Sequence, residues 1–478
     1  MATTAGAKKG LWSTIRRIAA SDRISGLIML GFALTGLVLA NLPATAHAFE
    51  TVAETHLFIP YTNLDLPIGH WAQDGLLTIF FLTVGLELKQ ELTTGSLANP
   101  KAAAVPMLCA VGGMIAPPIL FLAVTALFSQ IGPGEPGTLI LTTTGSSIPF
   151  SEMSHGWAVP TATDIAFSLA VLALFAKALP GSIRAFLMTL ATVDDLLAII
   201  LIAVFFSSIN AWYWFIGIAV CAAIWAYLVR LKKVPWIAVG IVGILAWIMM
   251  FEAGVHPTLA GVLVGLLTPS REMHGEFSPR AERYANKLQP FSALLALPIF
   301  ALFATGVHFE SMSPLLLVSP LVIALIVALV VGKPLGIITT AWLATHVGGL
   351  KMAKGLRVRD MIPAAVACGI GFTVSFLIAS LAYKNAELSA EARFGVLVAS
   401  LIAAAISGVL LSRQSKRFEK AAAAQAAAAE ALADAEAGES IDGNGTGQPS
   451  RTTKPTTPTE HPGTLADGTA SVEIDFRH

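Results

Sequence analysis

The chain has 478 residues, of which 55% are hydrophobic and only 13% charged, and its mean hydropathy is +0.73. A soluble globular chain carries about 25% charged residues, so this composition excludes that class and indicates a membrane protein. The formal net charge of zero gives no sign of a nucleic-acid-binding surface. The three cysteines, Cys109, Cys221 and Cys368, lie in apolar runs, and their spacing fits neither a disulfide framework nor a metal site.

The N-terminal region combines a basic segment, residues 1–23, with an apolar run at residues 24–42 and an Ala-x-Ala pattern at residues 44–48. This order is also that of a cleaved secretory signal. The apolar run is long for a signal sequence, however, and further apolar runs follow it. We therefore predict that residues 24–42 form a retained first membrane helix.

Eleven further apolar runs follow the first one along the chain. They are residues 71–88, 104–128, 158–176, 185–208, 211–229, 235–251, 255–268, 289–307, 316–343, 361–382 and 394–412. Several are short or contain Pro or Gly, yet together with the first run they predict an all-α membrane protein of about twelve transmembrane helices. The loop at residues 128–156 has no purpose that its sequence identifies.

Lysine and arginine are confined to alternate loops between these runs. With twelve crossings, the clusters on the side of the N-terminus are Lys89 and Lys101; Lys177 and Arg184; Arg230, Lys232 and Lys233; Arg271, Arg280, Arg283 and Lys287; Lys351, Lys354, Arg357 and Arg359; and Arg413, Lys416, Arg417 and Lys420. The opposite loops hold only Lys384 and Arg393. Basic loops stay in the cytoplasm, so both termini are predicted to be cytoplasmic.

Composition also divides the chain into three parts. We predict a cytoplasmic basic segment at residues 1–23, a transmembrane domain at residues 24–412 and a cytoplasmic tail at residues 413–478. The tail begins with an alanine-rich stretch, through Ala437, that can form a surface helix. The Gly-, Thr- and Pro-rich remainder has no apolar periodicity and is predicted to be disordered.

Two adjacent aspartates, Asp194 and Asp195, interrupt the fifth apolar run. Carboxylates at this depth are unfavourable, and in membrane helices they usually face a cavity and mark the path of an ion or proton. Neighbours on a helix point about 100° apart, so one aspartate can face water while the other faces a partner helix. The alternative is a pair of carboxylates held only by hydrogen bonds between helices.

Three other places break the apolar pattern. Residues 160–164 (Pro-Thr-Ala-Thr-Asp) lie in the fourth run, residues 368–373 (Cys-Gly-Ile-Gly-Phe-Thr) in the eleventh, and residues 332–334 (Gly-Lys-Pro) in the tenth. Irregular polar backbone is tolerated at membrane depth only where protein buries it or where it lines water. The alternatives are close helix packing for the glycines and a lysine that reaches the interface for Lys333.

The positions of these breaks predict an architecture. Helices 3–5 and 10–12 each contain an interrupted helix in the middle, and the two triplets run in opposite directions through the membrane. Interrupted helices at matching places in inverted repeats indicate a binding site at the midplane. Facing helix N-termini carry partial positive charge and C-termini partial negative charge. Asp164 is placed to balance the former, and Lys333 the latter or an aspartate of the fifth helix.

Several segments in order resemble the NhaA family of sodium/proton antiporters over about residues 24–412. They are TATDIAFSLAVLAL at 161–174, FLMTLATVDDL at 186–196, GKPLGI at 332–337, GIGFTVS at 369–375, FFLTVGLELKQEL at 80–92 and SGLIML at 25–30. Members of this family are standard examples of inverted-repeat transporters. The resemblance therefore also implies twelve helices with interrupted helices 4 and 11.

The resemblance implies a secondary active transporter of the bacterial cytoplasmic (inner) membrane, not an enzyme. It would exchange sodium or lithium for protons, electrogenically and under pH regulation, for sodium and pH homeostasis, without a cofactor or nucleic acid and with a homodimer as one possible state. Asp195 would be the principal ion and proton carboxylate, with Asp194 as its partner and Lys333 paired to Asp194 at some stage. Thr163 and Asp164 would lie beside the sodium site.

The family's pH-sensing cluster corresponds to Glu87, Lys89 and Glu91 at the end of the second helix. This sequence has Gln90 where the family often has arginine, so the family's detailed pH response is not carried over to it. Segment 270–288 aligns loosely, and no sensing role is carried over to Glu282.

Two other classes of transport protein remain open at this point. One is an inverted-repeat symporter for an organic anion of the bile-acid type, which proton movement on addition of sodium alone would argue against. The other is a channel, which the clustering of polar residues at one depth disfavours. An enzyme is disfavoured because no nucleophile–base set or metal-ligand spacing is present.

Overall fold

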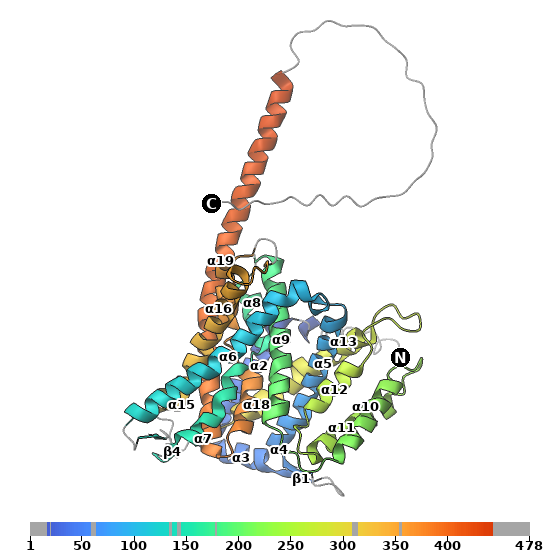
Figure 1. Ribbon diagram of the computed structural model, residues 1–478, viewed down its shortest axis with the longest axis vertical. Helices are drawn as coiled ribbons and strands as arrows, with labels where there is room; N and C mark the ends of the chain where they lie inside the picture. Colours follow the sequence, from blue (N-terminus) through green and yellow to red (C-terminus); the bar gives the residue numbers. More distant parts are fainter. Residues whose placement is uncertain are drawn as a thin grey trace. The chain divides into compact units, whose positions relative to one another are not determined.

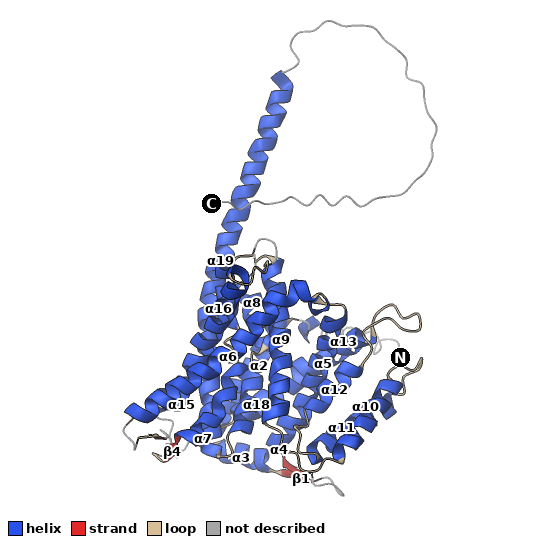
Figure 2. Ribbon diagram, viewed as in Figure 1, coloured by secondary structure: helices blue, strands red, loops and turns tan. Residues whose placement is uncertain are grey.

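The computed structural model describes residues 17–19, 21–58, 64–132, 136–140, 145–176, 179–307, 314–352 and 356–442. Helices make up most of this part of the chain, and the strands form two short hairpins (Figure 2). By its contacts the chain separates into two units, Met1–Ser415 and Lys416–His478. All the residues discussed below as parts of the site lie in the first unit.

The first membrane helices are joined by a short hairpin. The elements are α2 (Asp22–Asn41), α3 (Ala46–Glu54), β1 (His56–Phe58), β2 (Asp65–Pro67), α4 (Ile68–His70), the π-helical turn η1 (Trp71–Leu76), α5 (Leu77–Thr93) and the 3₁₀ turn η2 (Ser96–Ala98). β1 and β2 pair antiparallel, with Leu57 opposite Leu66. The second predicted span, residues 71–88, therefore begins as a π turn and continues five residues further than the sequence predicted.

The next elements carry the first predicted triplet of helices. They are α6 (Pro100–Ile131), β3 (Thr138–Ile140), β4 (Ser147–Pro149), α7 (Phe150–Ser154), the 3₁₀ helix η3 (His155–Thr161), α8 (Ile165–Phe175) and α9 (Gly181–Phe205). The loop predicted at 128–156 is thus an antiparallel hairpin followed by α7 and the start of η3. α9 lies in the middle of the bundle and packs against α6 (Figure 1).

The central elements include a pair of helices at one flank. They are α10 (Trp214–Leu228), α11 (Trp236–Glu252), α12 (Leu259–Leu267), α13 (Arg280–Phe291), the π turn η4 (Ser292–Ala296) and α14 (Leu297–Thr305). α10 and α11 lie side by side on the right of the view (Figure 1). The predicted ninth span at 289–307 in fact begins at Arg280, because the polar α13 continues into α14 through η4.

The last elements carry the second triplet. They are η5 (Pro314–Val318), α15 (Pro320–Val327), the π turn η6 (Ala328–Gly332), α16 (Lys333–His346), η7 (Val358–Met361), α17 (Ile362–Ala367), α18 (Phe372–Ala382) and α19 (Ala386–Asp442). α19 does not end at residue 412, the last residue of the twelfth predicted span, but runs on through the alanine-rich stretch, which the sequence allowed to be helical. Of the residues predicted to be disordered, 438–478, residues 438–442 belong to α19, so the prediction is wrong for them, and residues 443–478 lie outside the described residues.

Among the described residues, six helices are long and apolar enough to cross a membrane, and two bent pairs bring the number to eight. The long ones are Arg23–Asn41, Ala103–Ile131, Gly181–Phe205, Arg280–Thr305, Pro320–His346 and Ala386–Ala431. The chain is therefore a multi-pass membrane protein. The structure does not itself establish the predicted twelve crossings, because α10, α11 and α12 are short; α12, predicted at 255–268, has only 9 helical residues.

Close backbone contacts fix the helix that carries Lys333. A Cβ at Gly336 on α16 would lie 2.2 Å from the carbonyl oxygen of Gly112 on α6, which no side chain can accommodate. Small residues at such a crossing let helix backbones approach closely inside a membrane. The position of Lys333, three residues earlier on α16, is therefore set by the contact between α6 and α16.

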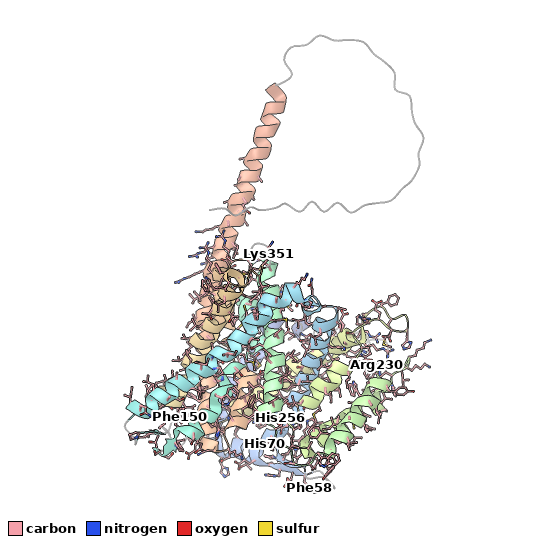
Figure 3. The ribbon with its side chains drawn as sticks, viewed as in Figure 1. Phe58, His70, Phe150, Arg230, His256 and Lys351 are labelled. Atoms are coloured by element: carbon pink, nitrogen blue, oxygen red, sulfur yellow. The ribbon has the colours of Figure 1, made fainter. Side chains whose placement is uncertain are left out.

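The loops of the bundle lie on two sides. Lys351 lies at the top of the bundle in the view and Arg230 at about mid-height on its right, whereas His70 and Phe58 lie toward the bottom (Figure 3). The loops after α10 and α16 therefore both lie away from the β1–β2 hairpin.

Candidate functional site

Two broken helices cross in the interior of the bundle. η3 and α8 bend by 51° at residues 162–164, and the pair formed by η7–α17 and α18 bends by 58° at residues 368–371. These are the two interruptions that the sequence predicted in the fourth and eleventh runs. In both cases a polar or glycine-rich segment within an apolar run leaves the helix and becomes extended or turn-like backbone.

The two breaks bond directly to each other. The amide of Asp164 donates to the carbonyl oxygen of Ile370 over 2.7 Å. The Thr163 hydroxyl donates to the carbonyl oxygen of Cys368 over 3.0 Å. Backbone groups freed by a helix break find no water in a bilayer, so these mutual hydrogen bonds make the crossing tolerable at membrane depth.

Asp164 lies between the N-termini of two half-helices. Its carboxylate accepts hydrogen bonds from the amide of Phe167 in α8 (2.9 Å) and from the amide (3.2 Å) and hydroxyl (2.9 Å) of Thr373 in α18. The residue is only 3% exposed. A negative charge at a helix N-terminus is favourable because the free amides there carry partial positive charge. Asp164 therefore balances both N-termini at once.

Lys333 lies at the opposite kind of helix end. It is fully buried, and its ammonium donates to Asp194 Oδ2 over 2.8 Å and also to the carbonyl oxygen of Thr161, at the C-terminus of η3. The C-terminal carbonyls of a helix carry partial negative charge, so the lysine is stabilised by the helix end and by the carboxylate together. Both partners lie well inside the protein, which excludes a lysine that reaches the membrane interface.

The two aspartates of α9 differ in their contacts. Asp194 is 1% exposed and pairs with Lys333 through Oδ2, while its Oδ1 has no hydrogen-bond partner among the described residues. Asp195 is 6% exposed and lies next along the helix. A buried oxygen without a partner is costly and normally has an explanation such as an ion. Carboxylate, hydroxyl and carbonyl oxygens of this kind are the ligands that hard cations prefer.

The glycines at the break of the eleventh run serve two purposes. A Cβ at Gly369 would lie 2.5 Å from the carbonyl oxygen of Leu329 in η6, so this glycine lets the helix that carries Lys333 approach the break. The helix also opens at this point, as its 58° bend shows. The two explanations that the sequence left open, close packing and helix opening, therefore both apply here.

The three residues predicted to sense pH lie at the C-terminal end of α5. Glu87 is exposed, whereas Lys89 and Glu91 are half-buried. The Glu91 carboxylate accepts hydrogen bonds from the amide and the hydroxyl of Ser96, both over 2.8 Å. These residues therefore belong to an element that is not part of the crossing.

Comparison with known proteins gives the family. A family model described as Na+/H+ antiporter 1 matches residues 16–411. The chain belongs to this family. Its match covers both broken helices and the aspartates of α9.

Relatives of this chain in several organisms are named Na(+)/H(+) antiporters. A protein from Bifidobacterium longum, named Na(+)/H(+) antiporter NhaA, is 97% identical over 478 residues, which is the whole of both chains. Another from Bifidobacterium breve is 87% identical over 477 residues, also across 100% of each chain. The protein named Na(+)/H(+) antiporter NhaA 3 of Streptomyces coelicolor is 38% identical over 400 residues, covering 83% of this chain and 80% of its own.

Several hydroxyls of this antiporter-family site were not singled out from the sequence. Ser168 donates to the carbonyl oxygen of Ala367 (2.9 Å), and Ser375 donates to that of Val159 (2.8 Å). Ser400 on α19 accepts from the amide of Phe372 over 3.3 Å, at the N-terminus of α18. Their signal was weak, since single serines also occur in ordinary membrane helices. What marks them is that each lies within an apolar run and is fully buried.

Proposed function

We propose that this protein exchanges sodium or lithium for protons across the bacterial cytoplasmic membrane. One observation carries the proposal: the Lys333–Asp194 pair is buried beside two crossed broken helices, next to a second aspartate. Ionisable residues inside a membrane mark ion and proton pathways. Membership of the Na+/H+ antiporter 1 family supports the same cargo.

In this proposal sodium and protons compete for the same oxygens. Asp195 and the free Oδ1 of Asp194 supply carboxylate oxygens, and Thr163 supplies a nearby hydroxyl. Asp164 adds negative charge while remaining bound to the two helix N-termini. If the protein changes its access only when either sodium or protons occupy these groups, each sodium ion that moves one way requires protons to move the other way.

Lys333 accounts for a second exchangeable proton. Sodium that binds to the aspartates weakens the attraction between Asp194 and the ammonium of Lys333. Lysine readily changes its protonation when it is buried without a partner. Release of that proton, together with one from Asp195, makes two protons exchange for one sodium ion, and such transport moves net charge.

The topology that we propose has twelve crossings. The six long helices and the two bent pairs supply eight of them. The remaining four are η1 with α5, and α10, α11 and α12. Inverted repeats of α6 to α9 and of α15 to α19 then place one broken helix in the middle of each triplet. Arg230 and Lys351 both lie away from the β1–β2 hairpin (Figure 3), and the basic character of their loops supports a cytoplasmic location for these loops and both termini.

We further propose that Glu87, Lys89 and Glu91 regulate transport according to pH, which would adapt the exchange to sodium and pH homeostasis. These groups lie at the C-terminal end of α5, which would be on the cytoplasmic side in the topology that we propose, where they would meet cytoplasmic protons. Glu87 is exposed, and Lys89 and Glu91 are half-buried, so none of the three is sealed off inside the bundle.

A vesicle assay tests the proposed exchange. The protein is reconstituted, a pH gradient is imposed, and an acridine dye reports proton movement as sodium, lithium and potassium are added in turn at several pH values either side of neutral. Proton movement on addition of sodium or lithium alone supports the proposal. Movement that requires an organic anion, or flux too fast for alternating access, would contradict it.

A second measurement tests the charge carried in each cycle. In the variant Asp194→Asn with Lys333→Gln, some transport should remain, but the membrane potential that sodium addition generates should change. A potential-sensitive dye in the same vesicles measures this. Unchanged electrogenicity would count against proton carriage by Lys333.

A further inference from the structure

A chain of hydrogen bonds runs from the end of α5 to α9. Glu91 Oε2 accepts from the amide and the hydroxyl of Ser96, and Ser96 Oγ lies 2.8 Å from Thr189 Oγ1. Thr189 is 6% exposed. The three residues belong to α5, η2 and α9, so the chain links the region proposed to sense pH with the helix that carries the aspartates.

The turn between α5 and η2 is built to hold Ser96 over Glu91. A Cβ at Gly95 would lie 2.4 Å from Glu91 Oε2 and 2.7 Å from its Cα. Only glycine therefore lets the chain fold back this closely. Glu91 in turn accepts from the amide of Ser96, the first residue of η2, which fixes the serine hydroxyl in position.

Thr189 lies five residues before Asp194 on α9, about 7.5 Å along the helix axis. α9 is thus bonded to other elements at two levels, through Asp194 to Lys333 of α16 and through Thr189 to Ser96 of η2. The contact of Thr189 with Ser96 lies within one and a half turns of the contact of Asp194 with Lys333. A small shift of α9 at Thr189 therefore alters how Asp194 and Asp195 contact their partners.

The hydroxyl groups of Ser96 and Thr189 each have one hydrogen, so the hydrogen bonds in this series must all point in one direction or the other. Ser96 has one hydroxyl hydrogen, and it can donate to Glu91 or to Thr189 but not to both. Thr189 likewise donates either to Ser96 or to the carbonyl oxygen of Ala185, 2.9 Å away in its own helix. When Glu91 is ionised, it attracts the Ser96 hydrogen through a charge-assisted bond, so Thr189 donates to Ser96. When Glu91 is neutralised, Ser96 can donate to Thr189, which then donates to Ala185.

The second arrangement changes α9 itself. A threonine that donates to the carbonyl four residues earlier slightly bends and destabilises a helix. The charge on Glu91 therefore decides whether Thr189 bonds outward to η2 or back to its own helix, one and a half turns before Asp194.

We propose that Ser96 and Thr189 are positioning residues that couple the charge on Glu91 to the setting of the aspartates on α9. They act through Asp194 and Asp195 and do not bind the cargo. This inference rests on the proposed function, since it concerns the apparent affinity of the site for sodium.

Other charged groups contribute to the electrostatic surroundings of Glu91. Those on the elements packed against this end of α5 and against η2 and α9 are Glu87 and Lys89 on α5, Lys101 on α6, Arg184 on α9, Arg271 after α12, and Arg280, Glu282, Arg283 and Lys287 on α13. The substitutions below leave all of these groups in place.

The test removes the Thr189 hydroxyl at constant shape. Thr189→Val is compared with Thr192→Val, because Thr192 lies one turn further along α9 and its hydroxyl donates to the Met188 carbonyl of the same helix. The sodium concentration for half-maximal proton flux is measured in vesicles across the pH range. We expect about a three- to tenfold change for Thr189→Val, little change for Thr192→Val, and recovery in Thr189→Ser.

A double-mutant cycle of Glu91→Gln and Thr189→Val separates coupling between the two residues from an effect of each substitution on its own surroundings. Glu91→Gln should alter the sodium dependence in the wild-type background and have no further effect in the Thr189→Val background. Additive effects of Glu91→Gln and Thr189→Val, or identical behaviour of Thr189→Val and Thr192→Val, would overturn the inference. Absence of sodium-driven proton flux in the wild type would instead refute the proposed function.

Discussion

Removal of Lys333 without removal of Asp194 is the most informative perturbation of the buried pair. In Lys333→Ala, Asp194 Oδ2 loses its partner at 2.8 Å, and the carbonyl oxygen of Thr161 loses a charged donor. Both members of the pair are almost completely buried, at 0% and 1% exposure of their side chains. Loss of one partner from such a pair typically costs about 3–5 kcal/mol, because it leaves an uncompensated buried charge.

The double variant Asp194→Asn with Lys333→Gln is the matched control. It removes both charges and leaves two neutral groups that can still bond to each other and to Thr161. The cost should then be closer to that of a neutral hydrogen bond, about 1 kcal/mol. We therefore expect Lys333→Ala to be the less stable protein, although it changes one residue and the control changes two.

Thermal unfolding in detergent measures this difference through the fluorescence of the nine tryptophans. The unfolding temperature should fall by several degrees in Lys333→Ala and by clearly less in the double variant. An unchanged unfolding temperature in Lys333→Ala would refute the reasoning. So would a double variant that is as unstable as Lys333→Ala, because the cost would then not come from an unpaired charge.

Two further predictions concern the loop before α13 and a glycine at a helix break. Hydrogen bonds from the buried Arg280 lower the pKa of the Glu276 carboxyl below its ordinary value. The stabilising effect of Glu276 is therefore present above about pH 4.3, the ordinary value, and is lost as the pH falls through the lowered pKa. The difference in unfolding temperature between the wild type and Glu276→Gln should be full at pH 7 and shrink as the pH falls below about 4.3, and a difference that grows on acidification would contradict this. Gly369→Ala places a Cβ 2.5 Å from the Leu329 carbonyl oxygen, whereas the Cβ of the control variant Gly31→Ala meets nothing within 4 Å. Sodium-driven proton flux and the unfolding temperature should therefore fall in Gly369→Ala and stay unchanged in Gly31→Ala. Equal effects of the two variants would refute the close-contact argument.

Much of the site could be predicted from local sequence because its polar residues and glycines are unfavourable within an apolar membrane helix. A proline with threonines and an aspartate, or two glycines in an apolar run, cannot continue a lipid-facing helix, and both predicted breaks are present in the fold. A lysine in mid-helix needs a buried partner, and Asp194 lies 2.8 Å from it. The roles assigned to Asp195, Thr163 and the residues of α5 stay predictions, because they concern ions and protons.

Other features depended on tertiary structure and left little trace in the sequence. The hydroxyl of Ser400 reaches the N-terminus of α18 from another helix, and a serine in an apolar run does not reveal such a partner. The polar α13 joins α14 through a π turn, which moved the start of the ninth predicted helix to Arg280. Helix ends set by packing between elements, such as those of the short α12, cannot be read from hydropathy alone.

The central claim is that a cation and protons alternate on the buried carboxylates of α9. Sodium-driven proton flux in proteoliposomes tests it most directly when Asp195→Asn is compared with Asp65→Asn, a change in the exposed β1–β2 hairpin. We predict that Asp195→Asn abolishes the flux and that Asp65→Asn retains it. Normal flux in Asp195→Asn would contradict the account.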